Sequence, residues 1–217
     1  MNPICICFLA FIGLIEVQPF QHTLDLTTAP QESAPLKVAG GSGCAHGSSG
    51  QVPTRLPLHV RLLQTDRSEY TVGDQAVFDV SVQNGGSTPI RLPWRLHRGG
   101  DQMTGVEAAP VMQMRLTLLA IDQEGREHRL VGTMLAGAED DAGSTRVLQP
   151  GESALIRFGG RMRSISDAAE FLESISRGTM NLRARILVST GHCEWSAPAF
   201  SSNVINVSLH PISGRLH

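Results

Sequence analysis

Few side chains in this sequence have the types and spacing that catalysis or metal binding requires. The stretch GHCEW brings together His192, Cys193 and Glu194, and each of these side chains can bind a metal ion. Neighbouring side chains of an extended segment point in opposite directions, so they rarely bind one ion without further ligands. We therefore interpret GHCEW as a hairpin loop with a free or disulfide-bonded cysteine.

A second polar group is acidic. The stretch AEDDAG, residues 138–143, contains three carboxylates that could attract calcium, but it lacks the ligand spacing of an EF-hand loop. We interpret it as a solvated acidic loop. The eight histidines are scattered, and no two of them have metal-ligand spacing. We expect no metal and no cofactor.

Short enzyme motifs are also missing from the sequence. It has no HExxH zinc helix, no GxSxG nucleophile elbow, no Walker phosphate loop and no dinucleotide-binding GxGxxG. We therefore expect a protein that is not an enzyme. Catalytic triads assemble from distant positions, so an unrecognised hydrolase or metal enzyme is one alternative. That alternative predicts a concave pocket that gathers His97, His128 or His192 with carboxylates.

The stretch RLPWRLHRGG combines a tryptophan with three arginines. Trp94 falls on the apolar side of an alternating pattern, so we predict that it lies in the core. Arg91, Arg95 and Arg98 would then line the solvated side of the same strand. Because tryptophan and arginine are frequent in the centres of protein interfaces, these arginines are also a candidate interaction surface.

The N-terminus and the cysteines bear on the compartment. ICICFLAFIGLI, residues 4–15, is an apolar run with the length of a signal-peptide core, and it is shorter than the roughly 20 residues that cross a bilayer. No basic residue precedes it and no clear cleavage site follows, so a short anchor is the alternative. We expect an exported protein that is periplasmic, envelope-associated or secreted, and that meets a membrane only through this segment if it is not cleaved. An oxidising compartment would allow Cys44 to pair with Cys193, and two free thiols are the alternative.

Composition limits the partners and divides the chain. The 217 residues are 41% hydrophobic and carry a formal net charge of −2, which gives a core but no field that would attract nucleic acid. Residues 1–26 form the apolar signal-like or anchor segment. Residues 27–55 are rich in Gly, Ser and Pro and predict a flexible linker. The folded domain is expected over residues 56–211, followed by a tail over residues 212–217.

Within that domain the hydrophobic pattern has a period of two. In AVFDVSVQN, Ala76, Phe78, Val80 and Val82 fall on one side and Asp79 on the other, which is typical of a half-buried strand. The flanking stretches YTVGD and NGGSTP have turn chemistry. Similar patterns predict strands within residues 58–62, 90–96, 112–120, 127–135, 147–158, 180–188 and 205–209. Pro93 cannot donate to a ladder, so its strand should be at an edge or bulged.

One segment has a helical period instead. SISDAAEFLESISRG places an apolar stripe at spacings of three and four, which predicts a short helix in a crossover between strands. The residues of this stripe are Ile165, Ala168, Ala169, Leu172 and Ile175. Together these elements predict an all-β fold, an immunoglobulin-like β-sandwich of about seven to nine antiparallel strands with one short crossover helix.

The order of these pieces resembles bacterial immunoglobulin-like sandwich domains. The resemblance rests on YTVGDQAVFDVSVQNGGSTPIRLPW, LTLLAIDQEGREHRLVG, LQPGESALIRF, ISRGTMNLRARILV and SSNVINVSL. More narrowly, the chain is similar to the β-domain that precedes the catalytic domain in deuterolysin-like metallopeptidases, and to bacterial proteinase-inhibitor domains. Met180 stands where the last strand motif of that family has tyrosine, and the sequence has no HExxH, so no catalytic residue is carried over.

The sequence thus supports two hypotheses about function, in addition to the enzyme alternative given above. The first is a non-enzymatic exported module for protein–protein interaction or envelope structure, with a protein partner that the sequence does not name. The second, which the resemblance implies, is a peptidase-regulating domain, either an inhibitor or a pro-region-like domain, whose partner is a peptidase.

Overall fold

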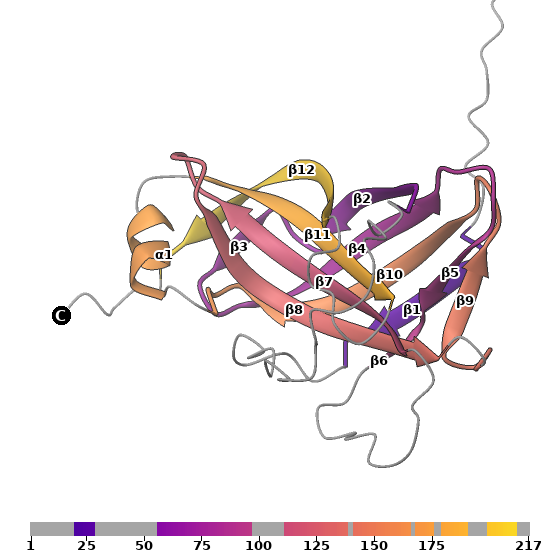
Figure 1. Ribbon diagram of the computed structural model, residues 1–217. Helices are drawn as coiled ribbons and strands as arrows, with labels where there is room; N and C mark the ends of the chain where they lie inside the picture. The colour runs from indigo at the N-terminus through magenta and orange to yellow at the C-terminus, as the bar shows by residue number, and fades with distance from the viewer. Residues whose placement is uncertain are drawn as a thin grey trace, which may run out of the picture.

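The computed structural model describes residues 20–28, 56–96, 111–138, 141–165, 168–175, 179–190 and 199–211. In these segments the chain is all-β, with twelve strands in three sheets and one helix, α1 (Ala168–Ile175) (Figure 1). The segments that carry the predicted signal core, Cys44, Arg98 and Cys193 lie outside the described residues.

The first large sheet has four strands, and its central pairs are antiparallel. The end strand β1 pairs in parallel with β10. In spatial order the strands are β1 (His22–Leu26), β10 (Ser153–Arg161), β4 (Gln75–Asn84) and β2 (Leu58–Thr65).

The second large sheet has six strands and is also mixed, because the short β3 pairs in parallel with β12. In order the strands are β3 (Glu69–Thr71), β12 (Ala199–His210), β11 (Met180–Thr190), β7 (Val111–Ile121), β8 (Glu127–Ala138) and β6 (Arg95–Leu96). A separate antiparallel pair is formed by β5 (Ile90–Pro93) and β9 (Thr145–Leu148).

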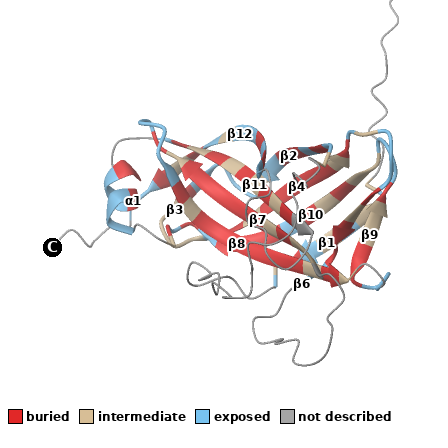
Figure 2. Cartoon of the chain, in the orientation of Figure 1, coloured by how far each residue is buried: buried red, intermediate tan, exposed pale blue. Residues whose placement is uncertain are grey.

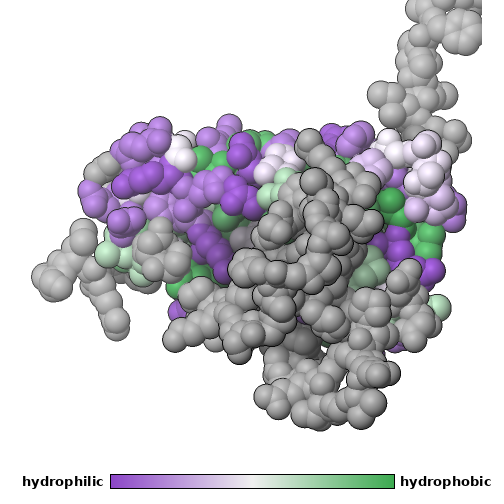
Figure 3. Space-filling model, viewed as in Figure 1, coloured by the Kyte–Doolittle hydropathy of each residue, from purple (hydrophilic) through white to green (hydrophobic). Residues whose placement is uncertain are grey.

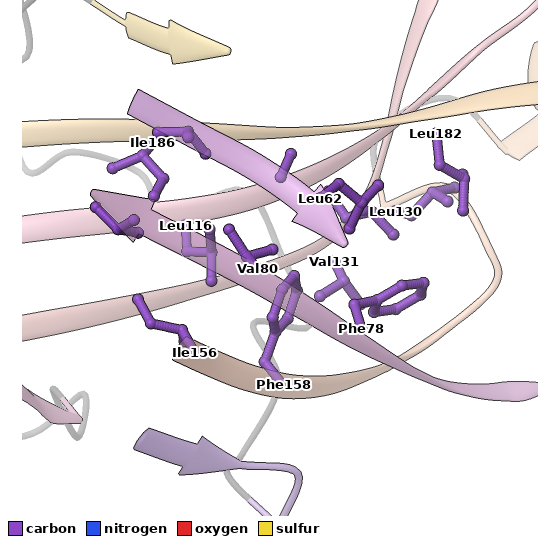
Figure 4. Close-up of a cluster of buried hydrophobic side chains, with 14 of the residues drawn as sticks. Leu62, Phe78, Val80, Leu116, Leu130, Val131, Ile156, Phe158, Leu182 and Ile186 are labelled. Carbon is purple, nitrogen blue, oxygen red and sulfur yellow. The ribbon is translucent and has the colours of Figure 1, made fainter. Parts of the chain in front are cut away.

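The core lies between the inward faces of the two large sheets. The four predicted inward residues of β4 are buried, as are the inward residues of β7 and β11 (Figure 2). Val80 and Ile156 from one sheet point toward Leu116 and Ile186 from the other (Figure 4). Each side chain removed from water in this way stabilises the fold by about 1.5–3 kcal/mol. The period-two pattern therefore predicted the core faces of the long strands correctly.

A buried amide at the end of β4 joins this strand to β9 and to the turn that follows it. Asn84 is fully buried, and its Nδ2 donates to the backbone carbonyls of Thr88 at 2.8 Å and Leu148 at 2.9 Å. Its Oδ1 accepts a hydrogen bond from the N–H of Gly86 at 2.9 Å. The NGGSTP turn is thus fixed by the side chain that begins it, as turn chemistry requires.

The predicted strand over residues 90–96 is interrupted. It divides at Trp94 into β5 and β6, which belong to different sheets. The backbone N–H of Trp94 donates to the carbonyl of Ser144 at 2.7 Å, and the indole is buried, as predicted. Pro93 ends β5, because a residue without an N–H donor cannot continue the ladder.

Three further predictions need correction. The folded part includes β1, which lies in the segment assigned to the N-terminus, so the domain does not start at residue 56. The strands outnumber the seven to nine expected, and two pairs are parallel. The additional strands β1, β3 and β6 have five residues or fewer, which is too short for an alternation signal.

The helix exists, but of the predicted apolar stripe on it Ile175 alone is buried, and Ala168, Ala169 and Leu172 are exposed. Phe171, Ser174 and Ile175 are buried, whereas Leu172 is 45% exposed. The ring of Phe171 packs on His128, with centroids 5.4 Å apart, and the Ser174 hydroxyl donates to a buried aspartate on the β7–β8 hairpin. The buried face of the helix thus makes a polar contact as well as apolar ones, and hydrophobic periodicity does not detect the polar contact.

A glycine on β10 lies in close contact with the other large sheet. Gly160 on β10 pairs with Ala76 on β4, so two small residues lie side by side on the inward face. A Cβ atom added at Gly160 would lie 1.7 Å from Cγ2 of Val131 on β8. Val131 therefore occupies the space that the missing side chain leaves.

We expect Gly160→Ala to lower the free energy of unfolding by about 1–3 kcal/mol, because overpacking a close-packed core forces its neighbours to move. Urea denaturation measures this loss. Val131→Ala removes the two γ-methyl groups that cause most of the overlap. The double variant should therefore lose less than the sum of the two single variants. Strict additivity would contradict the proposed contact.

Candidate interaction surface

The predicted arginine surface is only partly described. Arg91 lies on β5, and its Nη1 donates to Oγ1 of Thr145 at 3.1 Å. Arg95 is exposed on β6, which belongs to the six-stranded sheet. Arg98 lies outside the described residues, so a surface of three arginines stays a prediction. The break at Trp94 places the two described arginines on strands of different sheets.

Most of the predicted metal-capable side chains also lie outside the described residues, including His97, His192 and Glu194. Of the acidic loop, Asp141 is described, and its Oδ1 accepts a hydrogen bond from the N–H of Gly143 at 2.8 Å. Asp141 thus shapes its own turn. Within the described segments, no three His, Cys, Asp or Glu side chains gather in a way that could hold a metal ion.

One predicted histidine does meet a carboxylate, in a buried cluster between the β7–β8 hairpin and α1. Asp122 is 5% exposed and His128 is 1% exposed, and His128 Nε2 lies 3.2 Å from Asp122 Oδ2. The same oxygen accepts hydrogen bonds from Nε of Arg126 at 2.7 Å and from Oγ of Ser174 at 3.0 Å. The other oxygen accepts from the backbone N–H groups of Glu124 and Arg126. We call these residues the Asp122 cluster.

The order of contacts in the Asp122 cluster differs from that of a catalytic triad. In a triad the histidine lies between the serine and the aspartate and removes the proton from the serine. Here the aspartate is central, and the Ser174 hydroxyl donates to Asp122. Ser174 is also only 3% exposed, and its oxygen accepts from Nη2 of Arg126 at 2.8 Å. The geometry therefore fits a structural link that anchors α1 to the hairpin.

Hydrogen bonds determine the ionisation of this aspartate. Burial alone would raise the pKa of Asp122, because it removes the charge from water. The backbone N–H of Arg126, His128, the Arg126 guanidinium and Ser174 all donate to the carboxylate. Together they outweigh burial and hold the pKa of Asp122 well below its usual range. The cluster thus contains a buried anion that is stable at neutral pH.

A second polar group crosses the outer face of the four-stranded sheet. Arg157 on β10 and Asp79 on β4 are directly opposite, and two hydrogen bonds of 2.8 Å join them. Nε2 of Gln64 on β2 lies 3.3 Å from the same carboxylate, and Asp25 on β1 is opposite Arg157. The hydrogen bonds from Arg157 lower the pKa of Asp79 more than burial raises it. Asp79 points outward as predicted, and its partner is 78 residues away in sequence.

The two large sheets meet at a seam between β2 and β12, which lie side by side in Figure 1. No ladder joins these strands. Instead Oδ1 of Asn203 accepts from the N–H of Leu62 at 2.9 Å, and its Nδ2 donates to the carbonyl of Leu62 at 3.0 Å. A side-chain amide has the same donor and acceptor as a peptide group. Asn203 therefore takes the place of a strand partner for one residue of β2.

Irregularities in both strands allow this contact. β2 shifts register against β4 between Leu62 and Gln64, and β12 shifts against β11 opposite Arg183 and Arg185. In the second shift the N–H of Ala184 donates to Oγ of Ser202 at 2.9 Å. Bulges of this kind turn side chains toward new partners. The polar run of Ser201, Ser202 and Asn203 inside an apolar alternation was the sequence signal for this irregularity, and period counting missed it.

Apolar side chains are exposed beside the seam. Leu63 and Val204 each follow a member of the Leu62–Asn203 pair, and they are 38% and 41% exposed. The third large apolar residue with such exposure in the described segments is Leu172, on α1. On the side shown in Figure 3, hydrophilic residues cover most of the visible described surface. We call Leu63, Asn203 and Val204, which lie beside the buried Leu62, the β2–β12 surface.

Comparisons with known proteins identify no family. No protein-family model matches the chain, and no curated protein matches it. Among solved structures, it is similar to the alkylpurine DNA glycosylase AlkC of Pseudomonas fluorescens, with a TM-score of 0.33 and 9% identity, over 71% of this chain and 30% of that one. It is also similar to the sporulation control protein Spo0M of Bacillus subtilis, with a TM-score of 0.33 and 13% identity, over 71% of this chain and 49% of that one. A third similar structure is that of AvmM, which catalyses macrocyclization in alchivemycin A biosynthesis. Its TM-score is 0.32 and its identity 10%, over 75% of this chain and 94% of that one. The chain spans less than half the length of the first two proteins.

The Asp122 cluster predicts a specific response to acid. A carboxylate with a lowered pKa stabilises the fold above its unfolded pKa of about 4, and this stabilisation is lost as the pH falls toward the lower folded pKa. Asp122→Asn should therefore lower the free energy of unfolding at pH 7 by about 2 kcal/mol. Between about pH 5 and about pH 2, the variant should lose less of its free energy of unfolding than the wild type. Urea midpoints across this range measure both effects.

The control for this prediction is Glu69→Gln, which changes an exposed carboxylate on β3. This variant should keep the pH dependence of the wild type. If Asp122→Asn shows the same acid-induced loss as the wild type, the cluster does not stabilise the fold through its charge.

Proposed function

We propose that this chain is a non-enzymatic, exported module that binds another protein through its β2–β12 surface, and that its fold is immunoglobulin-like. The observation that carries the proposal is a pair of exposed apolar side chains, Leu63 and Val204, placed beside a bond between two sheets. Isolated apolar side chains are common on protein surfaces. Two of them beside the Leu62–Asn203 hydrogen bonds offer an apolar contact at the seam.

The fold assignment is supported by two features. Two large sheets share one apolar core, and the predicted inward residues of β4, β7 and β11 supply much of it. Three of the motifs that carry the resemblance to bacterial immunoglobulin-like domains include these strands, and the other two lie in β9 and β10 and in β12. Domains of this architecture commonly use loops and strand edges for recognition.

A binding function, rather than catalysis, is supported by how the reactive side chains are used. Ser174, His128 and Asp122 are all buried in one cluster, and the Ser174 hydroxyl donates to a carboxylate. Asp79 is 5% exposed and has a bidentate arginine partner. Both polar groups thus hold strands and a helix together.

The β2–β12 surface indicates the chemistry of its partner. Arg61, next to Leu62, is exposed on β2, and Arg183, whose Nη1 lies 3.9 Å from Oε1 of Glu127, is opposite Val204 in the β11–β12 ladder. A complementary protein surface would have an apolar centre and acidic side chains at its rim. Such a rim increases the association rate, while the apolar centre contributes most of the affinity.

Export is supported by the apolar run over residues 4–15, which has the length of a signal-peptide core. In the described segments, no helix is long and apolar enough to cross a membrane. The proposal therefore places the partner in the cell envelope or outside the cell.

The test compares a variant with two lysines at the seam and a variant with one lysine on α1, away from the seam. Leu63→Lys with Val204→Lys alters the β2–β12 surface, and Leu172→Lys alters an exposed leucine on α1. All three residues are exposed, so each change should alter stability by no more than about 0.5 kcal/mol. We expect a protein that the wild type captures from the envelope fraction to bind the seam variant at least about tenfold more weakly, because losing one interface anchor weakens binding by more than 1 kcal/mol.

Binding of the captured and purified protein is measured by titration against each variant, after thermal melts have shown that all of them are folded. Wild-type affinity in the Leu172→Lys chain and weakened affinity in the seam variant would support the proposal. Equal affinity of the seam variant and the wild type would overturn it.

A further inference from the structure

The N-terminal strand β1 is attached to the fold by one neighbour. It forms one end of the four-stranded sheet and, among the described residues, its ladder partner is β10 alone. The five paired residues run from His22 opposite Ala154 to Leu26 opposite Phe158. The pairing is parallel, so no hairpin joins the two strands, and they are far apart in sequence.

The edge of β10 nevertheless fits this strand closely. Leu26 is 6% exposed and belongs to the core, and Leu24 packs against it. The imidazole of His22 meets the ring of Trp94 edge-on, with centroids 6.5 Å apart. On the outer face Asp25 is opposite Arg157, and the two charges attract each other. The β10 edge therefore selects an extended segment with leucines two apart and a carboxylate between them.

The connection of β1 to the next strand is long. Residues 27–57 separate Leu26 from Leu58, which is 31 residues. A chain of this length spans up to roughly 100 Å when fully extended. The covalent connection therefore does not require that β1 pair with the β10 of its own chain.

A second copy of the chain carries the same strand and offers the same edge. Every contact that β1 makes with its own β10 would be reproduced with the β10 of the other copy, including the leucine contacts and the Asp25–Arg157 pair. Exchange of an identical element makes no new demand on the interface, which is why it is a low-cost route to dimers. The vacated edge would otherwise leave a row of backbone donors and acceptors unpaired.

We propose that two copies of this chain exchange their β1 strands and thereby form a dimer. The occupant of each β10 edge is residues 22–26 of the other copy, paired in the register seen here. The dimer presents two β2–β12 surfaces, and β2 is the end of the sheet opposite to β1. Strand exchange is independent of whether that surface binds a protein.

Cysteine pairs that trap one register test this proposal. Thr23 and Leu155 are opposite each other in β1 and β10, on the outer face of the sheet. All variants are made in the full chain with its four native cysteines replaced by serine. Thr23→Cys chains are mixed with Leu155→Cys chains at increasing concentration under mild oxidation. We expect a disulfide-linked dimer of one copy of each, in a fraction that rises with concentration.

A matched control uses a strand pair in the middle of the same sheet. Gln83 on β4 and Ser153 on β10 are also opposite each other, and both are half-buried. Gln83→Cys chains mixed with Ser153→Cys chains should give no linked dimer, because these strands are held within one copy by neighbours on both sides. A single chain with Thr23→Cys and Leu155→Cys should form an internal disulfide, which confirms the β1–β10 register.

Each result has one meaning. A linked dimer from the 23–155 mixture and none from the 83–153 mixture supports strand exchange. An internal disulfide without any linked dimer overturns it, and so does equal linking of both mixtures, which would show unspecific thiol contact. Failure of the internal disulfide would refute the β1–β10 register and the proposal with it.

Discussion

Contact between the inward faces of two sheets determines most of this structure. Phe78 and Phe158 face each other from neighbouring strands with ring centroids 5.4 Å apart, and Val131 from the other sheet fills the space above Gly160. Protein interiors have the packing density of crystals, so one small residue on β10 and one branched residue on β8 must match. The distance between the sheets then determines which other groups can reach across it, and these include the Asn203 amide at the seam.

Polar side chains inside this fold hold segments that the apolar core cannot orient. Asp122 joins a hairpin to α1, Asn84 joins β4 to β9 and its own turn, and Asp79 joins β4 to β10. A buried polar group without a partner would destabilise the fold by about 1–3 kcal/mol. Each of these residues has several partners, so burial is compensated. Their hydrogen-bonding capacity is used within the fold, and this directs attention to the edges as the places for recognition.

The sequence predicted the parts of the structure that depend on local periodicity. Alternation identified the buried faces of the long strands, and the stretch YTVGD marked a turn in which Gly73 has a positive φ angle. It did not identify β1, because five residues with leucines two apart occur in many unstructured segments. It also placed Leu172 on the buried side of α1, whereas the side that carries Phe171 and Ser174 packs on His128 and Asp122.

The candidate surface was harder to predict, for a related physical reason. Asn203 bonds to Leu62 across 141 residues, while Val204 is exposed opposite Arg183 in the regular part of the β11–β12 ladder. No local pattern encodes a contact between two sheet edges, since it depends on where each strand ends in space. The one local sign was a polar run inside β12, and its functional meaning required the position of β2.

The two ends of the four-stranded sheet are protected in different ways. Exposed strand edges invite pairing with other chains, and proteins therefore cover or interrupt them. At β2, one amide side chain occupies a residue of the edge and a bulge shifts the register, so a regular ladder cannot extend there. At β10, a short tethered strand occupies the edge with regular register, so the site remains a template for pairing. The first edge therefore favours side-chain contacts with a partner, while the second favours an extended segment such as β1 itself.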